Sequence, residues 1–384
     1  MRRCKFGKLI LLIFIFVLSL FFIEFKEKKK PVNYKDEKKV TEVKQKQSRL
    51  SLVMVGDALL HSSVYNDAYT GSGYDFSRQL EYIRPIVKKY DLAFYNQESI
   101  LGGTDIGLSD YPCFNSPQEF GDEMLSMGFN LVSLANNHTL DRGVNGVQHA
   151  CDYWNKHKDV LWAGSYCSQN DADEVKIKEK NGIKYTMLAY TYGTNGIKVP
   201  DGKDYLVNLY SDEKAKQDIL KVRDKTDLLI VSMHWGTEYR SVPTEEQKRQ
   251  ALYLSNLGVD IIIGTHPHVV EPIDYVNNTL VIYSLGNFIS AQSTNSDYNT
   301  MVELMSSVDV IKTVKNGKSS IKLENLNNEL LYNYYKKSSR WYGFKVIPFS
   351  QMNSSFNNDY QRLYTKYSDI VKMYDKNIKI NNVN

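Results

Sequence analysis

Short apolar runs recur along the middle of the chain, and each is followed at once by polar side chains. The runs span residues 50–55, 92–95, 131–135, 228–233, 259–263 and 280–285. Runs of this length, rich in Val, Ile and Leu, predict buried strands. Helical patterns at 143–157 and 245–257 separate several of them. This alternation predicts an α/β fold with a largely parallel sheet that helices cover on both faces.

Residues with metal-binding or catalytic chemistry gather where these runs end. The residues that follow the runs are Asp57; Asn96 and Glu98; Asn136, Asn137, His138 and Asp141; His234, Trp235 and Glu238; His266 and His268; and Asn287. In open parallel sheets, ligands bind beyond the carboxyl ends of the strands. Because the polar residues follow the carboxyl ends of several strands, we predict that they form a single site at one edge of the sheet. The histidines among them predict that this site binds metal.

The sharpest motif is His266-Pro267-His268, which directly follows a predicted buried strand. Proline biases the residue before it toward an extended backbone. In an extended segment, residues i and i+2 point the same way. We therefore expect the imidazoles of His266 and His268 to reach one metal ion.

A third histidine follows another predicted strand. His234 ends the run 228–233, Gly236 permits close approach of the backbone, and Glu238 lies nearby. We interpret His234 as a metal ligand and Trp235 as a wall of the pocket.

Carboxylate and amide side chains supply the oxygen ligands. Asp57 ends the first strand, where its carboxylate could bridge two cations, although a turn is its alternative role. Asn96 and Glu98 share a face if their segment is extended. Glu98 is the better ligand for a divalent ion, and we expect Asn96 to orient it by a hydrogen bond. His61 could face the site from a first helical turn.

The segment 136–141 offers an amide oxygen on Asn137 and an imidazole on His138, while the role of Asn136 stays open. Asp141 has two candidate roles. It could cap the helix that begins near Gly143, or it could hold His138 in one tautomer.

The N-terminal segment has the features of a membrane anchor. An uncharged run of 15 residues, 9–23, follows four basic residues, as in a secretory signal. It is shorter than the about 20 apolar residues of a full span, and no small-x-small cleavage site precedes the lysines at 26–30. We predict an uncleaved, single-pass transmembrane helix at 1–25 that contacts lipid through residues 9–25, in preference to a cleaved peptide.

Charge is distributed unevenly along the chain. Residues 1–50 hold 14 Lys/Arg and 5 Asp/Glu, whereas the rest hold 34 and 39, a balance of −5. A mildly acidic body argues against nucleic-acid binding, which needs a basic face. We predict a lysine-rich stalk at 26–49, one globular domain at 50–355, and a polar tail at 356–384 with a weak helical pattern.

Six ordered motifs carry a resemblance to a known family. They are Gly56-Asp57, Asn96-x-Glu98, Asn136-Asn137-His138-x-x-Asp141, His234-Trp235-Gly236-x-Glu238, His266-Pro267-His268 and Gly286-Asn287-Phe288. Over residues 50–290, this set resembles the CapA family of bacterial poly-γ-glutamate capsule biosynthesis proteins. The resemblance implies a two-sheet α/β sandwich similar to the calcineurin-like metallophosphoesterases, with helices on both outer faces and a dinuclear metal site.

The resemblance also implies roles for individual residues. It implies metal ligation by Asp57, Glu98, Asn137, His234, His266 and His268, with two divalent ions of the Mn, Zn or Fe type. His138 takes the place of a histidine that helps the leaving group or stabilises charge, and we group Asp141 with it as catalytic. We expect the remaining members, His61, Asn96, Asn136, Trp235, Glu238 and Asn287, to support the ligands or the substrate.

Two functions of different classes stay open. The complete ligand set favours a metal-dependent hydrolase outside the cytoplasm, whose substrate is either a phosphoester or, as the resemblance implies, a γ-glutamyl amide in an anionic capsule polymer. However, Leu59 stands where metallophosphoesterases carry the His of an Asp-x-His motif, and Asn96-x-Glu98 replaces their Gly-Asp-x-x-Asp pattern. These departures favour a non-catalytic accessory subunit that works with other capsule synthase or export subunits.

The predicted anchor has a topological consequence. We expect alkaline phosphatase fused to the C-terminus to be active, because this enzyme folds only outside the reducing cytoplasm. Phosphatase activity of cells that carry the fusion is the measurement. An inactive fusion that is expressed at full length would contradict the predicted orientation.

Overall fold

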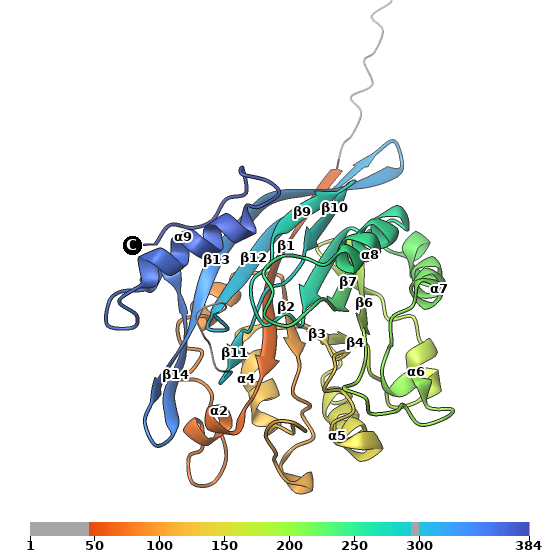
Figure 1. Cartoon of the computed structure of the whole chain (residues 1–384). Helices are drawn as coiled ribbons and strands as arrows, with labels where there is room; N and C mark the ends of the chain where they lie inside the picture. The colour runs from red at the N-terminus through yellow and green to blue at the C-terminus, as the bar shows by residue number, and fades with distance from the viewer. Residues whose placement is uncertain (1–45, 293–298, 384) are drawn as a thin grey trace, which may run out of the picture. The chain divides into compact units, whose positions relative to one another are not determined.

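Two β-sheets organise the described part of the chain, which is residues 46–292 and 299–383 of the computed structural model (Figure 1). The strands of the first sheet, in spatial order, are β14 (Trp341–Pro348), β13 (Lys318–Lys337), β12 (Val302–Lys315), β1 (Lys46–Leu59), β2 (Leu92–Gln97), β3 (Leu131–Ser133) and β4 (Leu161–Ala163), with β11 (Ile289–Ser290) paired to β1. Strands β1 to β4 run parallel, and β12 to β14 continue the sheet in antiparallel pairs.

The second sheet has a parallel centre and antiparallel edges. Its strands, in spatial order, are β5 (Lys178–Lys180), β6 (Ile183–Thr191), β7 (Leu228–His234), β8 (Ile261–Thr265), β10 (Thr279–Ile282) and β9 (Ile273–Val276). The edge pairs β5–β6 and β9–β10 are antiparallel hairpins. All six apolar runs identified in the sequence contribute to strands, although they divide between two sheets.

Successive side chains along a strand point to opposite faces of the sheet, and this alternation forms the layers of the fold. Leu52 and Met54 of β1 face a core shared by both sheets, where they meet Ile230 and Ile263. The neighbouring Val53 instead faces a cluster with α2 (Ser62–Asp67), α4 (Glu119–Met127) and α5 (Gly143–Trp154). On the second sheet, the odd-numbered positions of β7 pack against α7 (Asp212–Val222) and α8 (Glu245–Asn256). The predicted α/β sandwich with helices on both outer faces is confirmed.

Shorter elements complete the architecture. The remaining helices are α3 (Arg84–Val87), α6 (Gln169–Asp173) and α9 (Tyr360–Val371), with 3₁₀ turns at Thr104–Ile106, Asp204–Leu206, Arg223–Lys225 and Phe349–Gln351. Helix α9 lies across β13 (Figure 1) and buries Leu363, Tyr367 and Val371 in the core between the sheets. The helical pattern in the predicted polar tail is therefore packed against the domain.

The N-terminal predictions fall mostly outside the described residues. The predicted anchor at 1–25 and all but the last four residues of the predicted stalk belong to this undescribed part. Residues 46–49 already pair with β12, so β1 begins four residues before the predicted start of the domain. No helix within 46–292 or 299–383 combines the length and the apolar character that a membrane crossing requires.

Close backbone contact between β8 and the segment after β10 leads to a stability prediction. A Cβ added at Gly264 would lie 1.9 Å from the carbonyl oxygen of Tyr283. We expect Gly264→Ala to lower the free energy of unfolding by about 1–3 kcal/mol, because a backbone carbonyl cannot rotate away as a side chain can. Urea unfolding measures this change. Gly193→Ala is the matched control, since its Cβ would meet no atom within 4 Å, and equal losses in both variants would contradict the prediction.

Candidate metal centre

Strand ends from both sheets converge on one site. Asp57 lies on β1, Asn96 lies opposite it on β2, and a register shift between Met54 and Asp57 marks a bulge in β1. His234 is the last residue of β7, and Thr265 beside it ends β8. The bulge re-aims the end of β1, so a carboxylate of the first sheet meets imidazoles of the second.

The two carboxylates at the centre are fully buried but have different surroundings. Asp57 accepts hydrogen bonds from the side chain of Asn96 (2.8 Å) and from the backbone N–H of His266 (3.1 Å). Neither carboxylate oxygen of Glu98 has a hydrogen-bond partner within the described residues. A buried carboxylate without donors is costly, so Glu98 requires a proton or a cation.

Three histidines surround these carboxylates. His234 Nε2 lies 3.7 Å and His268 Nε2 lies 3.8 Å from Glu98 Oε1. His268 Nδ1 lies 3.7 Å from Asp57 Oδ2, and the ring of His266 is centred 4.8 Å from that of His234. All three rings are almost completely buried.

Neighbouring polar groups set the orientation of the imidazoles. His268 Nδ1 lies 2.8 Å from Asn287 Oδ1, an acceptor, so Nδ1 donates its proton and Nε2 keeps a lone pair. Thr265 Oγ1 lies 3.0 Å from His234 Nδ1 and orients that ring. Partners of this kind fix the tautomers of metal-binding histidines. Asn137 Oδ1 and His234 Nε2, both predicted ligand atoms, lie 2.8 Å apart.

The donor set fits divalent metal. At this site, two groups of side chains have ligand atoms within 4.8 Å of one another, namely Asp57, Glu98 and His268, and Glu238, His266 and His268. Mixed imidazole and carboxylate donors suit ions such as Zn, Fe and Mn. The unpartnered oxygens of Glu98 and the unpartnered Nδ1 of His266 are the ligand atoms that such ions would satisfy.

Burial shifts the protonation of the metal-free site. It raises the pKa of Asp57 to about 7 and holds the pKa of Glu98 well above its ordinary value, where nearby Asp57 adds to the effect. Burial also lowers the pKa of His266 to about 3 and the pKa of His234 and His268 well below the usual range. The histidines are therefore neutral ligands, and a bound cation must displace protons from the carboxylates.

His138 and Asp141 form a separate pair beside the metal centre. His138 Nδ1 lies 2.7 Å from Asp141 Oδ2, which also accepts the backbone N–H of Phe114 at 2.7 Å. The hydrogen bond puts the proton on Nδ1 and leaves Nε2 available. Of the two roles open for Asp141, the structure supports the contact with His138, and Arg142 rather than Asp141 is the N-cap of α5.

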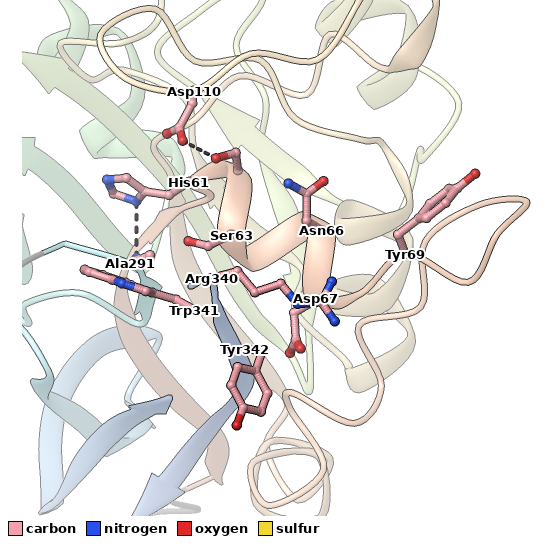
Figure 2. A pocket seen from close by; sticks show the side chains of 11 residues that line it. His61, Ser63, Asn66, Asp67, Tyr69, Asp110, Ala291, Arg340, Trp341 and Tyr342 are labelled. Carbon is pink, nitrogen blue, oxygen red and sulfur yellow. Dashed lines mark hydrogen bonds between the residues drawn. The ribbon is translucent and has the colours of Figure 1, made fainter. Parts of the chain in front are cut away.

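A cleft of about 800 Å³ opens over these groups. Its lining includes His138, Asp141, His268 and Glu238, and the aromatic ring of Phe114 contacts His138 edge-on at 4.8 Å between centroids. His61 lies on the wall of this cleft. Its Nδ1 accepts the backbone N–H of Ala291 at 3.2 Å, a hydrogen bond that is drawn in Figure 2. The His138–Asp141 pair and the candidate metal ligand His268 therefore line one space that is large enough for a ligand.

Residues 51–292 match the model of the bacterial capsule synthesis protein family PGA_cap. The chain belongs to this family. It is 32% identical over 177 residues to the PGA biosynthesis protein CapA of Bacillus subtilis, which covers 43% of this chain and 44% of that protein. It is 26% identical over 300 residues to the capsule biosynthesis protein CapA of Bacillus anthracis, which covers 73% and 67% respectively. The match to the first relative thus spans less than half of its length.

The chain is also similar to solved structures, at lower sequence identity than to the two Bacillus proteins. A putative 5'-nucleotidase from Staphylococcus aureus aligns with a TM-score of 0.47 at 17% identity, over 84% of this chain and 58% of that one. The calcineurin-like phosphoesterase YfkN from Bacillus subtilis aligns with a TM-score of 0.45 at 14% identity, over 84% and 98%. Similarity at these TM-scores and identities does not assign the activity of either protein to this chain.

The predicted extended conformation of the His266-Pro267-His268 motif is wrong. Both histidines have positive φ, 96° for His266 and 59° for His268. Such backbone is costly for residues other than glycine. The backbone N–H of His266 turns inward to Asp57, and the two rings still lie near each other, 5.9 Å apart. The histidines converge because of a tight turn at the end of β8 and not because of strand periodicity.

Two supporting roles also need correction. Asn96 orients Asp57 and not Glu98, because its side-chain N–H groups reach Asp57 Oδ1. Trp235 is not a wall of the cleft. Its indole packs in the core beside α8 and donates a hydrogen bond to the carbonyl of Tyr283 at 2.9 Å, since the residue after β7 points away from His234.

Other predicted residues lie at the site in supporting positions. Asn136 accepts the backbone N–H of His138 and donates to the carbonyl of Gln97. Glu238, which we expected to act in support, instead offers a carboxylate within reach of His266 and His268.

Sequence reasoning missed residues that follow β6. Asn195 accepts a hydrogen bond from Asn137 at 3.1 Å and lines the cleft, and the ring of Tyr192 lies 4.6 Å from that of His266. The signal was present, because the run Met187-Leu188-Ala189-Tyr190 is another apolar stretch with a polar ending. Buried Glu303 of β12 accepts a hydrogen bond from the backbone N–H of Gly56, next to Asp57. It does not follow an apolar run, so no pattern in the sequence identified it.

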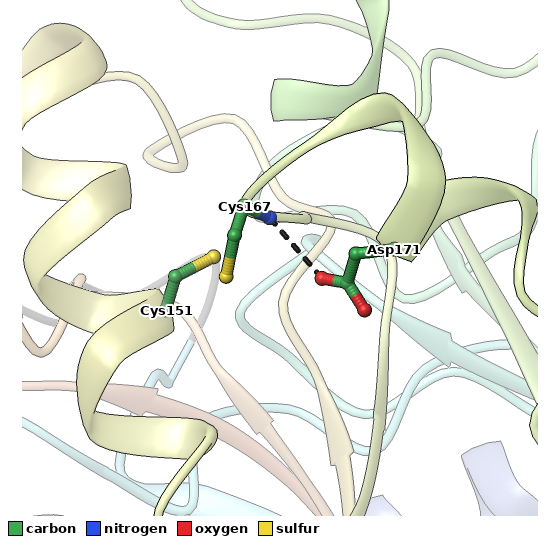
Figure 3. Close-up of side chains that lie close together, drawn as sticks. All are labelled: Cys151, Cys167 and Asp171. Atoms are coloured by element: carbon green, nitrogen blue, oxygen red, sulfur yellow. Dashed lines mark hydrogen bonds between the residues drawn. The ribbon is translucent and has the colours of Figure 1, made fainter.

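A second cluster of metal-ligand side chains consists of Cys151, Cys167 and Asp171 (Figure 3). It fits an ion poorly. Lys176 already pairs with Asp171 at 2.6 Å, and the backbone N–H of Cys167 donates to the same carboxylate. Burial raises the pKa of Cys151, which disfavours the thiolate that binds metal.

Metal content distinguishes the two clusters. We expect the purified chain to carry metal, and we expect the double change His266→Ala and His268→Ala to remove it, because both candidate ligand groups lose donors. Cys167→Ser should leave metal content unchanged. Elemental analysis after gel filtration is the measurement. Metal lost on Cys167→Ser, or kept by the double variant, would contradict the assignment.

Proposed function

We propose that this chain is a metal-dependent hydrolase that acts on a capsule polymer such as poly-γ-glutamate. The single observation that carries the proposal is Glu98, a fully buried carboxylate without a hydrogen-bond donor. It lies among neutral histidines, one of which, His268, is 3.8 Å from it and lines the open cleft. A structural role would be served equally well by a paired or an apolar residue. Two divalent ions are the proposed occupants, since further donors lie on both sides of His268, with Asp57 and Glu98 in one ligand group and Glu238 and His266 in the other.

The ligands and the His138–Asp141 pair have separate roles in this mechanism. Bound divalent ions supply a Lewis acid and a water that is deprotonated near neutral pH. Asp57, Glu98, Glu238 and the three histidines would hold these ions. Asp141 accepts a hydrogen bond from the Nδ1–H of His138, which leaves Nε2 of His138 to exchange a proton with the substrate or leaving group in the cleft.

The names of the relatives support the substrate class. Both Bacillus proteins are described by their role in PGA or capsule biosynthesis. Poly-γ-glutamate is an anionic polyamide, so bond cleavage here would be amide hydrolysis. Because the described domain is acidic overall, the ions themselves would provide the positive charge that attracts such a polymer.

We further propose that the domain works outside the cytoplasm, held at the membrane by residues 9–25. The charge pattern and uncharged run of the N-terminal segment support this location. Other capsule synthase or export subunits are its proposed partners, and no nucleic acid is expected.

One observation favours the accessory alternative. Leu59 lines the cleft. It stands at the position where metallophosphoesterases carry the histidine of their Asp-x-His motif. An apolar side chain at this position provides no donor, so the ions could serve to bind polymer for a synthase without cleaving it.

His138 separates these two functions. We expect His138→Ala to keep its metal and to lose about 10²–10⁴-fold in turnover, the usual contribution of general acid–base catalysis. His268→Ala should lose both metal and turnover. The assay incubates each variant with γ-linked polyglutamate and Mn²⁺ or Zn²⁺ and follows the size of the product.

His149→Ala is the matched control, because His149 lies on α5 and lines no part of the cleft. If the wild type cleaves nothing with any metal, while His138→Ala restores capsule to a deletion strain, the accessory function replaces the hydrolase.

A further inference from the structure

A second cavity, of about 720 Å³, adjoins the cleft over the metal ligands. The two cavities share His61, Ala291 and Trp341 as a common wall. Figure 2 shows this second cavity between α2 and the turn that connects β13 to β14. Each cavity is of the size that holds a drug-sized ligand, so together they exceed the needs of one monomer and suit several units of a chain.

The shared wall is held in place before any ligand arrives. The ring of Trp341 stacks on Tyr335, with centroids 4.9 Å apart and planes 9° from parallel. Lys337 Nζ lies 4.2 Å from the centre of the Trp341 ring. Tyr335 in turn donates a hydrogen bond to the carbonyl of Gln292 at 3.1 Å. Rigid aromatic walls bind ligands at little entropic cost.

Positive charge is concentrated at this wall although the domain is acidic overall. Lys336, Lys337 and Arg340 are exposed and lie within five positions at the β13–β14 turn. Arg340 lines the second cavity, and its guanidinium makes no ion pair with any residue in 46–292 or 299–383. A guanidinium binds carboxylates with two parallel hydrogen bonds.

The side of the second cavity that α2 forms carries acceptors. Asp67 accepts backbone N–H groups of Gly343 and Phe344, and Asp110 accepts the hydroxyl of Ser62. Asn66 also lines the cavity. A polyamide with side carboxylates presents both complementary groups, an amide N–H for these acceptors and a carboxylate for Arg340. A polyphosphate has no N–H group to donate to the two aspartates.

We propose that the second cavity is a binding subsite for a carboxylate-bearing polyamide, in which Arg340 binds a side carboxylate of a unit several residues away from the metal-bound one. This inference rests on the proposed substrate class, but not on hydrolysis. Trp341 separates the two cavities and guides the chain from one to the other.

Binding of oligomers of two lengths tests the subsite. All variants are made in the full chain with His138→Ala, which prevents turnover, and are titrated with fluorescein-labelled γ-linked glutamate oligomers of two and ten units. We expect Arg340→Gln to weaken binding of the decamer by roughly 3–10-fold, as for a partly exposed charged hydrogen bond, and to leave the dimer unchanged. Arg340→Lys should recover part of the loss.

Arg362→Gln is the matched control, because Arg362 is an exposed arginine that lines neither cavity. The lysine-rich N-terminal residues add the same background to every variant. Equal decamer affinities of Arg340→Gln and Arg362→Gln would overturn the subsite. Arg340-dependent binding to phosphatidylglycerol vesicles, with unchanged decamer affinity, would also overturn it and would assign the turn to a membrane surface.

The outcome is independent of the hydrolase assignment. If the chain with His138 intact cleaves no polymer but decamer binding depends on Arg340, the subsite holds and the hydrolase fails. If the polymer is cleaved and Arg340→Gln has no effect on decamer binding, the hydrolase holds and the subsite fails.

Discussion

The rest of the site depends on the burial of Glu98. A carboxylate that is removed from water and receives no hydrogen bond costs several kcal/mol unless a proton or a cation compensates it. Asp57 differs, because two N–H groups already stabilise its charge. Metal binding and folding are therefore coupled at this position. The imidazoles cannot compensate Glu98 by becoming protonated, since burial lowers their pKa values as well.

The backbone around the ligands is bent in ways that only the packed sandwich can sustain. Positive φ at His266 and His268 costs about 1–3 kcal/mol for each residue. A Cβ at Gly56 would lie 1.9 Å from the carbonyl oxygen of Gly286, the same oxygen that accepts the N–H of Asp57. The sheets, each buried on both faces, stabilise these bends. Ligand geometry is thus a property of the whole fold rather than of its loops.

Elements with strong local signals could be predicted from the sequence, and elements defined by long-range pairing could not. Strands β2 and β7 are buried on both faces and appear as uninterrupted apolar runs, so their polar endings were identified correctly. The long strand β13 pairs only with antiparallel neighbours and carries many polar residues, so no run marked it. The turn at His266 was mispredicted, because proline indicates local preference whereas the hydrogen bond to Asp57 comes from a residue 209 positions away.

In the proposed metal centre, Glu238 would supply a donor where Leu59 supplies none. Glu238, which follows β7, brings its carboxylate within reach of His266 and His268, whereas Leu59 contributes an apolar wall. The proposed ligand set then contains three carboxylates and neutral imidazoles. Two divalent ions would leave it with one net positive charge, because Asp141 is paired with His138. Such a centre would attract an anionic polymer even in an acidic domain, and the exchange of an imidazole for a carboxylate would weaken that attraction without abolishing it.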